Sequence, residues 1–176
     1  MIDSHCHLDF PQFNGIREDC LREAQQAGVH TIINIGTDIP TSEKSVALAK
    51  QHDMVFAAVG VHPHDAGTLD DAVIDRLRAL AAESKVKAIG EIGLDYYRDL
   101  SPRPVQKQAL HRQLALAVET GLPVVIHTRE AFEDTLAIVS EYASDLPGGV
   151  FHCFPGGRDD AERVFALGFV ISVGGV

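Results

Sequence analysis

Histidine and glutamate side chains recur beside short apolar runs along this sequence. The candidate metal ligands are His5, His7, Glu91, His127 and His152. Imidazole and carboxylate ligands suit Zn, Mn, Fe and Ni, and they suit Mg where carboxylate and water dominate. A His-x-His pair arises easily by chance in a chain with nine histidines, but metal-competent side chains on four separate apolar runs are much rarer. These residue types therefore predict divalent-metal chemistry.

The apolar runs that carry these residues are expected to be parallel strands. They cover residues 2–8, 31–35, 55–61, 86–92, 123–127, 149–154 and 169–173. Several are rich in Val and Ile and alternate little, which is typical of strands with both faces buried. We expect Glu91 and His127 to end their strands and His152 to lie on its strand.

The amphipathic stretches between the runs predict helices. Four of them cover residues 16–27, 40–52, 132–143 and 158–167, a fifth is capped by Asp70, and a sixth begins at Pro104 and ends before Gly121. Strict alternation of seven strands and six helices predicts an α/β fold with a parallel sheet and right-handed crossovers. In a parallel barrel all strands open their carboxyl ends on one face, so distant ligands can converge there.

Side-chain direction along a strand argues against a mixed histidine and cysteine site. His5 and His7 lie two residues apart and point to the same side, so Cys6 points to the other side. By the same reasoning Cys153 points away from His152. We therefore expect imidazole and carboxylate ligands without a thiolate.

The composition favours one domain over residues 1–176. The net charge is −10, and the sequence has no cluster of five or more basic residues, which argues against a protein that binds nucleic acid through a surface of Lys and Arg. Three cysteines, few and odd in number, favour a reducing compartment over a disulfide framework. The N-terminal residues lack a signal-peptide pattern, and no apolar run reaches about 20 residues. We expect a cytoplasmic protein that does not engage a membrane.

Five ordered motifs resemble the TatD-type metal-dependent deoxyribonucleases, relatives of the amidohydrolase-like barrels. They are DSHCHLDF at 3–10, VGVHPH at 59–64, GEIGLDYYRD at 90–99, PVVIHTREA at 123–131 and VFHCFPGG at 150–157. The resemblance runs from residue 1 to 176 and implies a TIM-type (β/α)8 barrel with two divalent metal ions, Mg, Mn or Zn. It implies that His5 and His7 hold one ion, and that Glu91 bridges to a second ion held by His127 and His152.

The resemblance also implies a reaction, the hydrolysis of phosphodiester bonds that trims single-stranded DNA from its 3′ end. Two cations about 3.5–4 Å apart can activate a water and stabilise both the attacking and the leaving oxygen. By the same resemblance Glu91, His62 and Arg129 are the catalytic residues. His62 and Arg129 would face the substrate phosphate, with Asp95 and Tyr96 in the substrate-binding loop beside them.

The family pattern continues past residue 176 with an eighth strand that ends in a Thr-Asp-x-Pro motif. We therefore expect a C-terminally incomplete barrel of seven strands, without the eighth strand, the last helices and the Asp that completes the metal site. Metal would still bind, while hydrolysis would be impaired. The first and seventh strands would be open edges that permit self-association, and we expect no stable protein partner.

Two other functions stay open at the level of sequence. One is an amidohydrolase-type enzyme that cleaves amides, lactones or esters, many of which bridge their metals with a carboxylated lysine on the fourth strand. Here Lys85 and Lys87 lie at the beginning of that strand and Glu91 at its end, which favours the phosphodiesterase. The other is a metal-binding fragment without activity.

Overall fold

A parallel sheet of seven strands organises residues 1–174, which are the residues that the computed structural model describes. The strands lie in the order β1 to β7, so neighbours in sequence are neighbours in the sheet. All six pairings are parallel. The strands are β1 Ile2–Cys6, β2 Thr31–Ile35, β3 Val55–Val59, β4 Val86–Asp95, β5 Val124–Arg129, β6 Gly149–Phe151 and β7 Val170–Ile171.

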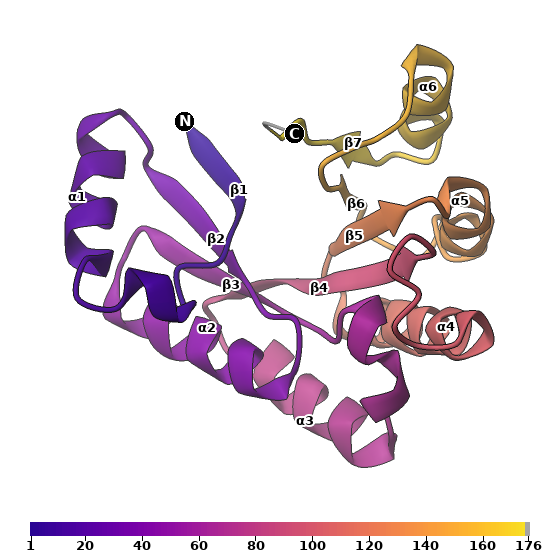
Figure 1. The fold of residues 1–176 in the computed structure, drawn as a ribbon, viewed down its shortest axis with the longest axis horizontal. Helices are drawn as coiled ribbons and strands as arrows, with labels where there is room; N and C mark the ends of the chain where they lie inside the picture. The colour runs from indigo at the N-terminus through magenta and orange to yellow at the C-terminus, as the bar shows by residue number, and fades with distance from the viewer. Residues whose placement is uncertain (175–176) are drawn as a thin grey trace.

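Helices connect the strands and cover one side of the sheet. They are α1 Arg17–Gln26, α2 Ile39–Gln51, α3 Asp71–Ala81, α4 Arg103–Thr120, α5 Phe132–Ser140 and α6 Arg158–Ala166, with short 3₁₀ helices η1 Pro11–Phe13 and η2 Pro63–Thr68. Figure 1 shows the sheet curled like part of a barrel, with the helices outside and β1 and β7 at its two edges. The expected TIM-type α/β architecture is confirmed for the described residues.

Local sequence signals explain where several helices begin and end. Asp38 caps α2 and forms a capping box with Thr41, while the side chain of Asp70 caps α3. Pro104 lies in the first turn of α4, where its missing N–H leaves no bond unmade. Gly121 ends α4 with a φ of 65°, a left-handed conformation that glycine adopts without strain. The predicted cap at Asp70 and the predicted ends of α4 are confirmed.

The predicted ends of two strands were too early. β4 runs on to Asp95 and β5 to Arg129, so Glu91 lies within β4 and His127 within β5. The two strands remain paired up to the partners Asp95 and Arg129. Leu94, which is fully buried, keeps the extension of β4 in the core.

The predicted ends of four other strands were too late: β3 ends at Val59 and β7 at Ile171, before the predicted residues 61 and 173. β1 ends at Cys6 and β6 at Phe151, so His7 and His152 follow their strands directly. After β6 the chain turns at Cys153, whose φ is 41°. A non-glycine residue with this φ is characteristic of a turn and cannot continue a strand.

Two apolar clusters hold the sheet and its helices together. The larger cluster packs helix side chains such as Leu77, Leu110 and Leu114 against the sheet. The smaller one consists of Ile35, Ala58, Ala88 and Val125, all from strands β2 to β5. Among residues 1–174, no helix combines the length and the apolar character needed to cross a membrane.

Candidate metal centre

Glu91 is the centre of a cluster of imidazole rings. Its side chain is only 4% exposed. The ring of His127 places Nδ1 2.9 Å from Glu91 Oε1, and the Nε2 atoms of His152 and His62 lie 3.8 and 3.9 Å from the same oxygen. Nε2 of His5 lies 3.5 Å from Oε2. A carboxylate buried this deeply is costly without positive or hydrogen-bonding partners, and four imidazoles supply them.

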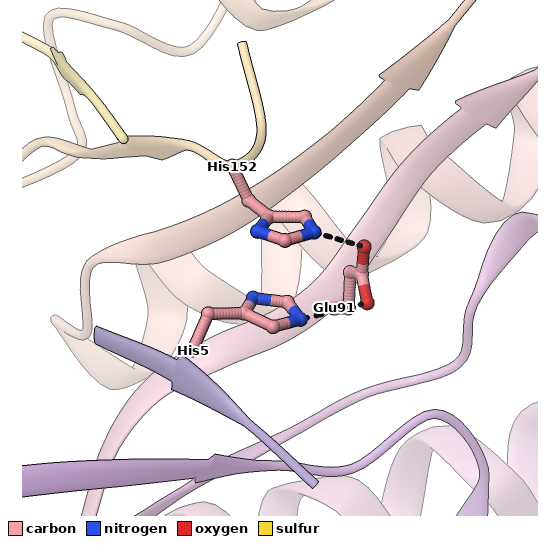
Figure 2. A group of neighbouring side chains, drawn as sticks. All are labelled: His5, Glu91 and His152. Carbon is pink, nitrogen blue, oxygen red and sulfur yellow. Dashed lines mark ion pairs between the residues drawn. The ribbon is translucent and has the colours of Figure 1, made fainter. Parts of the chain in front are cut away.

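These side chains form two candidate metal groups that share Glu91. One group is His5, Glu91 and His152, and the other is His62, Glu91 and His127. Within each group the ligand atoms lie within 4.8 Å of one another. In Figure 2 the rings of His5 and His152 lie face to face, and both point a nitrogen at Glu91. A carboxylate with its own pair of imidazoles on each side can bridge two cations.

By proximity the histidines pair otherwise than in the expected ligand sets, which stay predictions. His152 falls with His5 instead of His127, and His62, expected at the substrate phosphate, takes the place beside His127. Strand order explains the second pair, because β3 and β5 flank β4 and bring His62 and His127 to either side of Glu91. The curl of the sheet brings His5 and His152 together from more distant strands.

His7 lies beside the cluster and belongs to neither group among the described residues. Its Nε2 is 3.3 Å from Nε2 of His5, which confirms that the two rings point to the same side. Its Nδ1 lies 3.1 Å from the carbonyl oxygen of Ile35 and donates to it. A carbonyl partner of this kind fixes Nε2 as the nitrogen with a free lone pair. The ligand role expected for His7 stays a prediction.

The protonation states of the cluster suit a divalent cation. Burial lowers the pKa of His62 to about 3 and that of His152 to about 4, so both rings are neutral near pH 7. Burial alone would raise the pKa of Glu91, but hydrogen bonds from His127 and His5 outweigh it and hold that pKa well below its usual value. Nδ1 of His5 is buried without a hydrogen-bond partner in the described structure. Burial alone would lower the pKa of His127, but its hydrogen bonds to Glu91 and Asp95 raise it. The neutral rings of His62 and His152 beside an ionised carboxylate fit a cation such as Zn, Mn or Mg.

The two thiols expected to point away belong to neither group among residues 1–174. Sγ of Cys6 faces the carbonyl oxygen of Ile33 and Oδ1 of Asn34 on β2. This confirms the direction expected for Cys6. Burial raises the pKa of the Cys6 thiol to about 12, so the free thiol stays protonated near pH 7.

Asp95 is a buried support of the cluster. Its side chain is 1% exposed and accepts hydrogen bonds from four donors. These are Nε2 of His64 at 2.8 Å, Nε2 of His127 at 3.2 Å, and the backbone N–H groups of Tyr97 and Arg98 at 3.0 and 2.8 Å. The oxygens of Asp95 are thus already engaged within the protein, and the substrate contact expected for Asp95 stays a prediction.

Two residues that sequence reasoning missed hold Asp95 in place. His64, which the sequence analysis did not single out, binds the Asp95 carboxylate. Gln106, fully buried on α4, accepts from the Asp95 backbone N–H at 2.8 Å and donates to its carbonyl oxygen at 3.1 Å. The second histidine of the GVHPH motif was a visible signal for His64, whereas nothing in the pattern marks Gln106.

The other two residues expected at the substrate are Tyr96 and Arg129. They lie at the rim of the sheet, which is the edge where β4 and β5 have their carboxyl ends. Tyr96 is half-buried and donates its hydroxyl proton to Asp134 at 2.7 Å, with the guanidinium of Arg103 4.3 Å above its ring. Arg129 is exposed at the end of β5, and its guanidinium lies 4.0 Å from the ring centre of Tyr97. Of the two, Arg129 has a side chain open to an incoming anion.

Comparison with known protein families shows to which family the chain belongs. The family described as TatD related DNase matches residues 2–176. The chain belongs to the TatD family. This confirms the resemblance carried by the five motifs, and the relatives in this family include proteins named as metal-dependent hydrolases and nucleases.

Two relatives show the degree of similarity within the TatD family. The chain is 39% identical to "3'-5' ssDNA/RNA exonuclease TatD" of Cronobacter sakazakii, over 99% of this chain and 66% of that protein. It is 37% identical to "Uncharacterized metal-dependent hydrolase YabD" of Bacillus subtilis, over 99% of this chain and 69% of that protein. The chain thus spans about two thirds of the length of these TatD relatives.

Solved structures of the TatD family share the fold. The Escherichia coli TatD homologue YJJV superposes with a TM-score of 0.90 at 36% identity, covering 97% of this chain and 66% of that one. A TatD family hydrolase from Entamoeba histolytica gives a TM-score of 0.87 at 26% identity, covering 98% of this chain and 64% of that one. The curled sheet of this TatD chain is therefore the arrangement seen in its relatives.

Proposed function

We propose that this TatD family protein is a divalent-metal-dependent phosphodiesterase that trims single-stranded DNA from its 3′ end. The observation that carries the proposal is the sharing of Glu91 between two pairs of imidazoles. The relative named as a 3'-5' ssDNA/RNA exonuclease supports the choice of substrate. The net charge of −10 agrees with attraction of the phosphates by bound cations in place of a basic surface.

The residues of this chain have distinct tasks in the proposed reaction. When bound, two divalent cations, Mg, Mn or Zn, would activate a water and stabilise the oxygens of the phosphodiester. Glu91, His5 and His152 would hold one of them, and Glu91 with His62 and His127 the other. Arg129 on the exposed rim would bind a phosphate through its planar fork of donors. We retain Glu91, His62 and Arg129 as the residues on which turnover depends.

The experiment follows nucleotide release from a 3′-labelled single-stranded oligonucleotide. The purified chain is compared with Glu91→Ala, and with Glu133→Ala as a control in which an exposed carboxylate on α5 is removed. We expect slow release that needs Mn²⁺ or Mg²⁺ and stops with a chelator. Glu91→Ala should lower it about 100-fold or more, and Glu133→Ala should leave it unchanged.

Other outcomes would overturn the proposal in different ways. Release by Glu91→Ala at the parent rate would remove the shared carboxylate from the reaction. Metal binding without any nucleotide release would identify an inactive metal-binding chain. Metal-dependent cleavage of a lactone or amide, with DNA left intact, would identify an amidohydrolase-type enzyme.

The structure favours the phosphodiesterase over the amidohydrolase-type alternative. Lys87 is the second residue of β4, at the end of the strand opposite to the metal cluster. Lys85 precedes the strand, and its Nζ donates to the carbonyl oxygens of His52, Asp53 and Val55. Neither lysine lies among the candidate metal ligands, whereas Glu91 is common to both groups.

Two expectations about the surroundings of the protein remain part of this proposal. The cytoplasmic location rests on three cysteines, all of which are free. Self-association rests on β1 and β7, which are the two edges of the sheet formed by residues 1–174. Size-exclusion chromatography with light scattering tests the second expectation, because a monomer at all concentrations would contradict it.

A further inference from the structure

Tyr97 is an exposed aromatic side chain beside the metal centre. It is 57% exposed, whereas its neighbour Tyr96 is half-buried. The hydroxyl of Tyr96 is bound to Asp134. For the hydroxyl of Tyr97 the described residues offer no hydrogen bond. The ring of Tyr97 is therefore held at the surface without a part in the apolar core.

Arg129 places this ring on the metal side of the rim. Arg129 follows His127 by two residues on β5, so both side chains leave the strand on the same side. Arg129 therefore lies about 6.6 Å farther toward the carboxyl end than His127. Its guanidinium carbon lies 4.0 Å from the ring centre of Tyr97, which is a close cation–π contact.

The backbone of Tyr97 is fixed to the carboxylate that also holds a candidate metal ligand. The Tyr97 N–H donates to Oδ1 of Asp95, and Oδ2 of Asp95 accepts from His127. The N–H of the preceding Tyr96 donates to the carbonyl oxygen of Arg129 at 2.9 Å. These bonds fix the backbone of Tyr97 relative to both strands, and the contact with Arg129 orients its ring before any ligand arrives, which limits the entropy lost on binding.

We infer that Tyr97, backed by Arg129, is a stacking site for an unpaired nucleobase next to the phosphodiester that the metal centre holds. This inference rests on the proposed function. Aromatic rings bind single-stranded nucleic acid because every base has a face that stacks, largely without sequence preference. Arg129 covers part of the ring and can also reach a phosphate, so one base and one phosphate of the same strand would be bound together. A base within a duplex cannot stack on this ring.

The experiment measures binding without turnover. A fluorescein-labelled oligothymidylate with nuclease-resistant phosphorothioate linkages is titrated with Mn²⁺-loaded protein at low salt, and its fluorescence anisotropy gives the affinity. Tyr97→Ala should weaken binding by roughly 5- to 100-fold, the range for loss of one aromatic stacking contact. Tyr97→Phe keeps the ring and should bind like the parent. Phe165→Ala removes an equally exposed aromatic ring from α6 and should have no effect.

A change in the ligand tests whether the ring contacts a base. An oligonucleotide with abasic sites should bind the parent as weakly as the normal oligonucleotide binds Tyr97→Ala. The affinity of Tyr97→Ala should fall little further when the normal oligonucleotide is replaced by the abasic one, because the stacking contact is already missing in this variant. The chain has three tyrosines and no tryptophan, so quenching of tyrosine fluorescence that disappears in Tyr97→Ala is an independent signal.

Failure of the stacking site and failure of the proposed function give different results. The stacking site would be overturned if Tyr97→Ala and the parent bound the normal oligonucleotide with equal affinity. It would also be overturned if the abasic ligand lowered the affinity of both proteins by the same factor. Hydrolysis of methyl p-nitrophenyl phosphate by the parent is measured separately, because this small diester has no base to stack. If the parent neither cleaves it nor releases nucleotide from the 3′-labelled oligonucleotide with any divalent metal, the proposed function fails whatever the binding data show.

Discussion

Nε2 of His127 lies 3.2 Å from Oδ2 of Asp95, and this contact decides which nitrogen of the ring faces the metal centre. A carboxylate only accepts, so Nε2 carries the proton. Nδ1 lies 2.9 Å from Oε1 of Glu91, so both ring nitrogens face carboxylates, and Nδ1 is the nitrogen that would give up its proton to bind a cation. A carboxylate behind a histidine ligand orients the ring and raises its basicity. Asp95 is therefore a positioning residue of the candidate centre.

Asp95→Asn should weaken metal binding without unfolding the protein. The amide is the same size as the carboxylate but lacks its charge, so His127 loses its orienting partner. We expect the Mn²⁺ affinity measured by calorimetry to fall about 10- to 100-fold. Asp134→Asn changes another carboxylate of the same rim, which binds Tyr96 and Lys107 instead of a histidine, and should have no effect. Parent-like affinity in Asp95→Asn would contradict the positioning role.

The two candidate metal groups predict which double variant retains a cation. A chain with both His62→Ala and His127→Ala keeps His5, Glu91 and His152 and should bind one Mn²⁺ ion with a lowered total stoichiometry. Glu91→Ala removes the residue common to both groups and should abolish binding at both. His30→Ala, an exposed histidine outside the groups, is the control. Loss of all metal in the double variant would contradict the observed grouping.

Gly93→Ala should destabilise the protein strongly. Gly93 has a φ of 149°, and a Cβ there would overlap the carbonyl oxygen of His127 on β5. Neither backbone strand can move away without breaking the β4–β5 pairing, so we expect a loss of about 3 kcal/mol or more in the free energy of unfolding. Gly67→Ala, where a Cβ meets nothing within 4 Å, should change it little. Urea unfolding of both variants checks this.

The ion pair between Lys107 and Asp134 predicts a small acid-dependent stability term. The pKa of Asp134 is lowered first by its contact with Lys107 and then by the hydroxyl of Tyr96. Because the folded pKa lies below the unfolded one, the stabilisation is present above the unfolded pKa and is lost as the pH falls through the folded pKa. Asp134 is 44% exposed, so the effect is screened and should stay under about 1 kcal/mol.

The measurement compares the parent with Lys107→Met by urea unfolding at pH 7 and pH 2. The difference in the free energy of unfolding should be present at pH 7 and should vanish at pH 2. Lys44→Met, which removes an exposed lysine without an ion pair in the described structure, is the control. A difference that persists at pH 2 would show that the effect of Lys107 comes from packing of its stem.

The sequence by itself determined the elements of this protein and the set of side chains that could meet. Apolar runs and amphipathic stretches are local patterns, so the strands, the helices and the caps at Asp70 and Gly121 could be predicted. Parallel strands share one carboxyl edge, so His5, Glu91, His127 and His152 could be expected together before any coordinates. The structure brings all four into one cluster.

Only the tertiary structure decided which histidine faces which. The partners of Glu91 depend on the order and curl of the strands, which place His62 beside His127 and His5 beside His152. The roles of Asp95 and His64 also became visible only in the fold, because a hydrogen bond between residues 31 apart leaves no periodic trace in the sequence. Periodicity reports which face of an element is buried, whereas contacts across elements are set by packing.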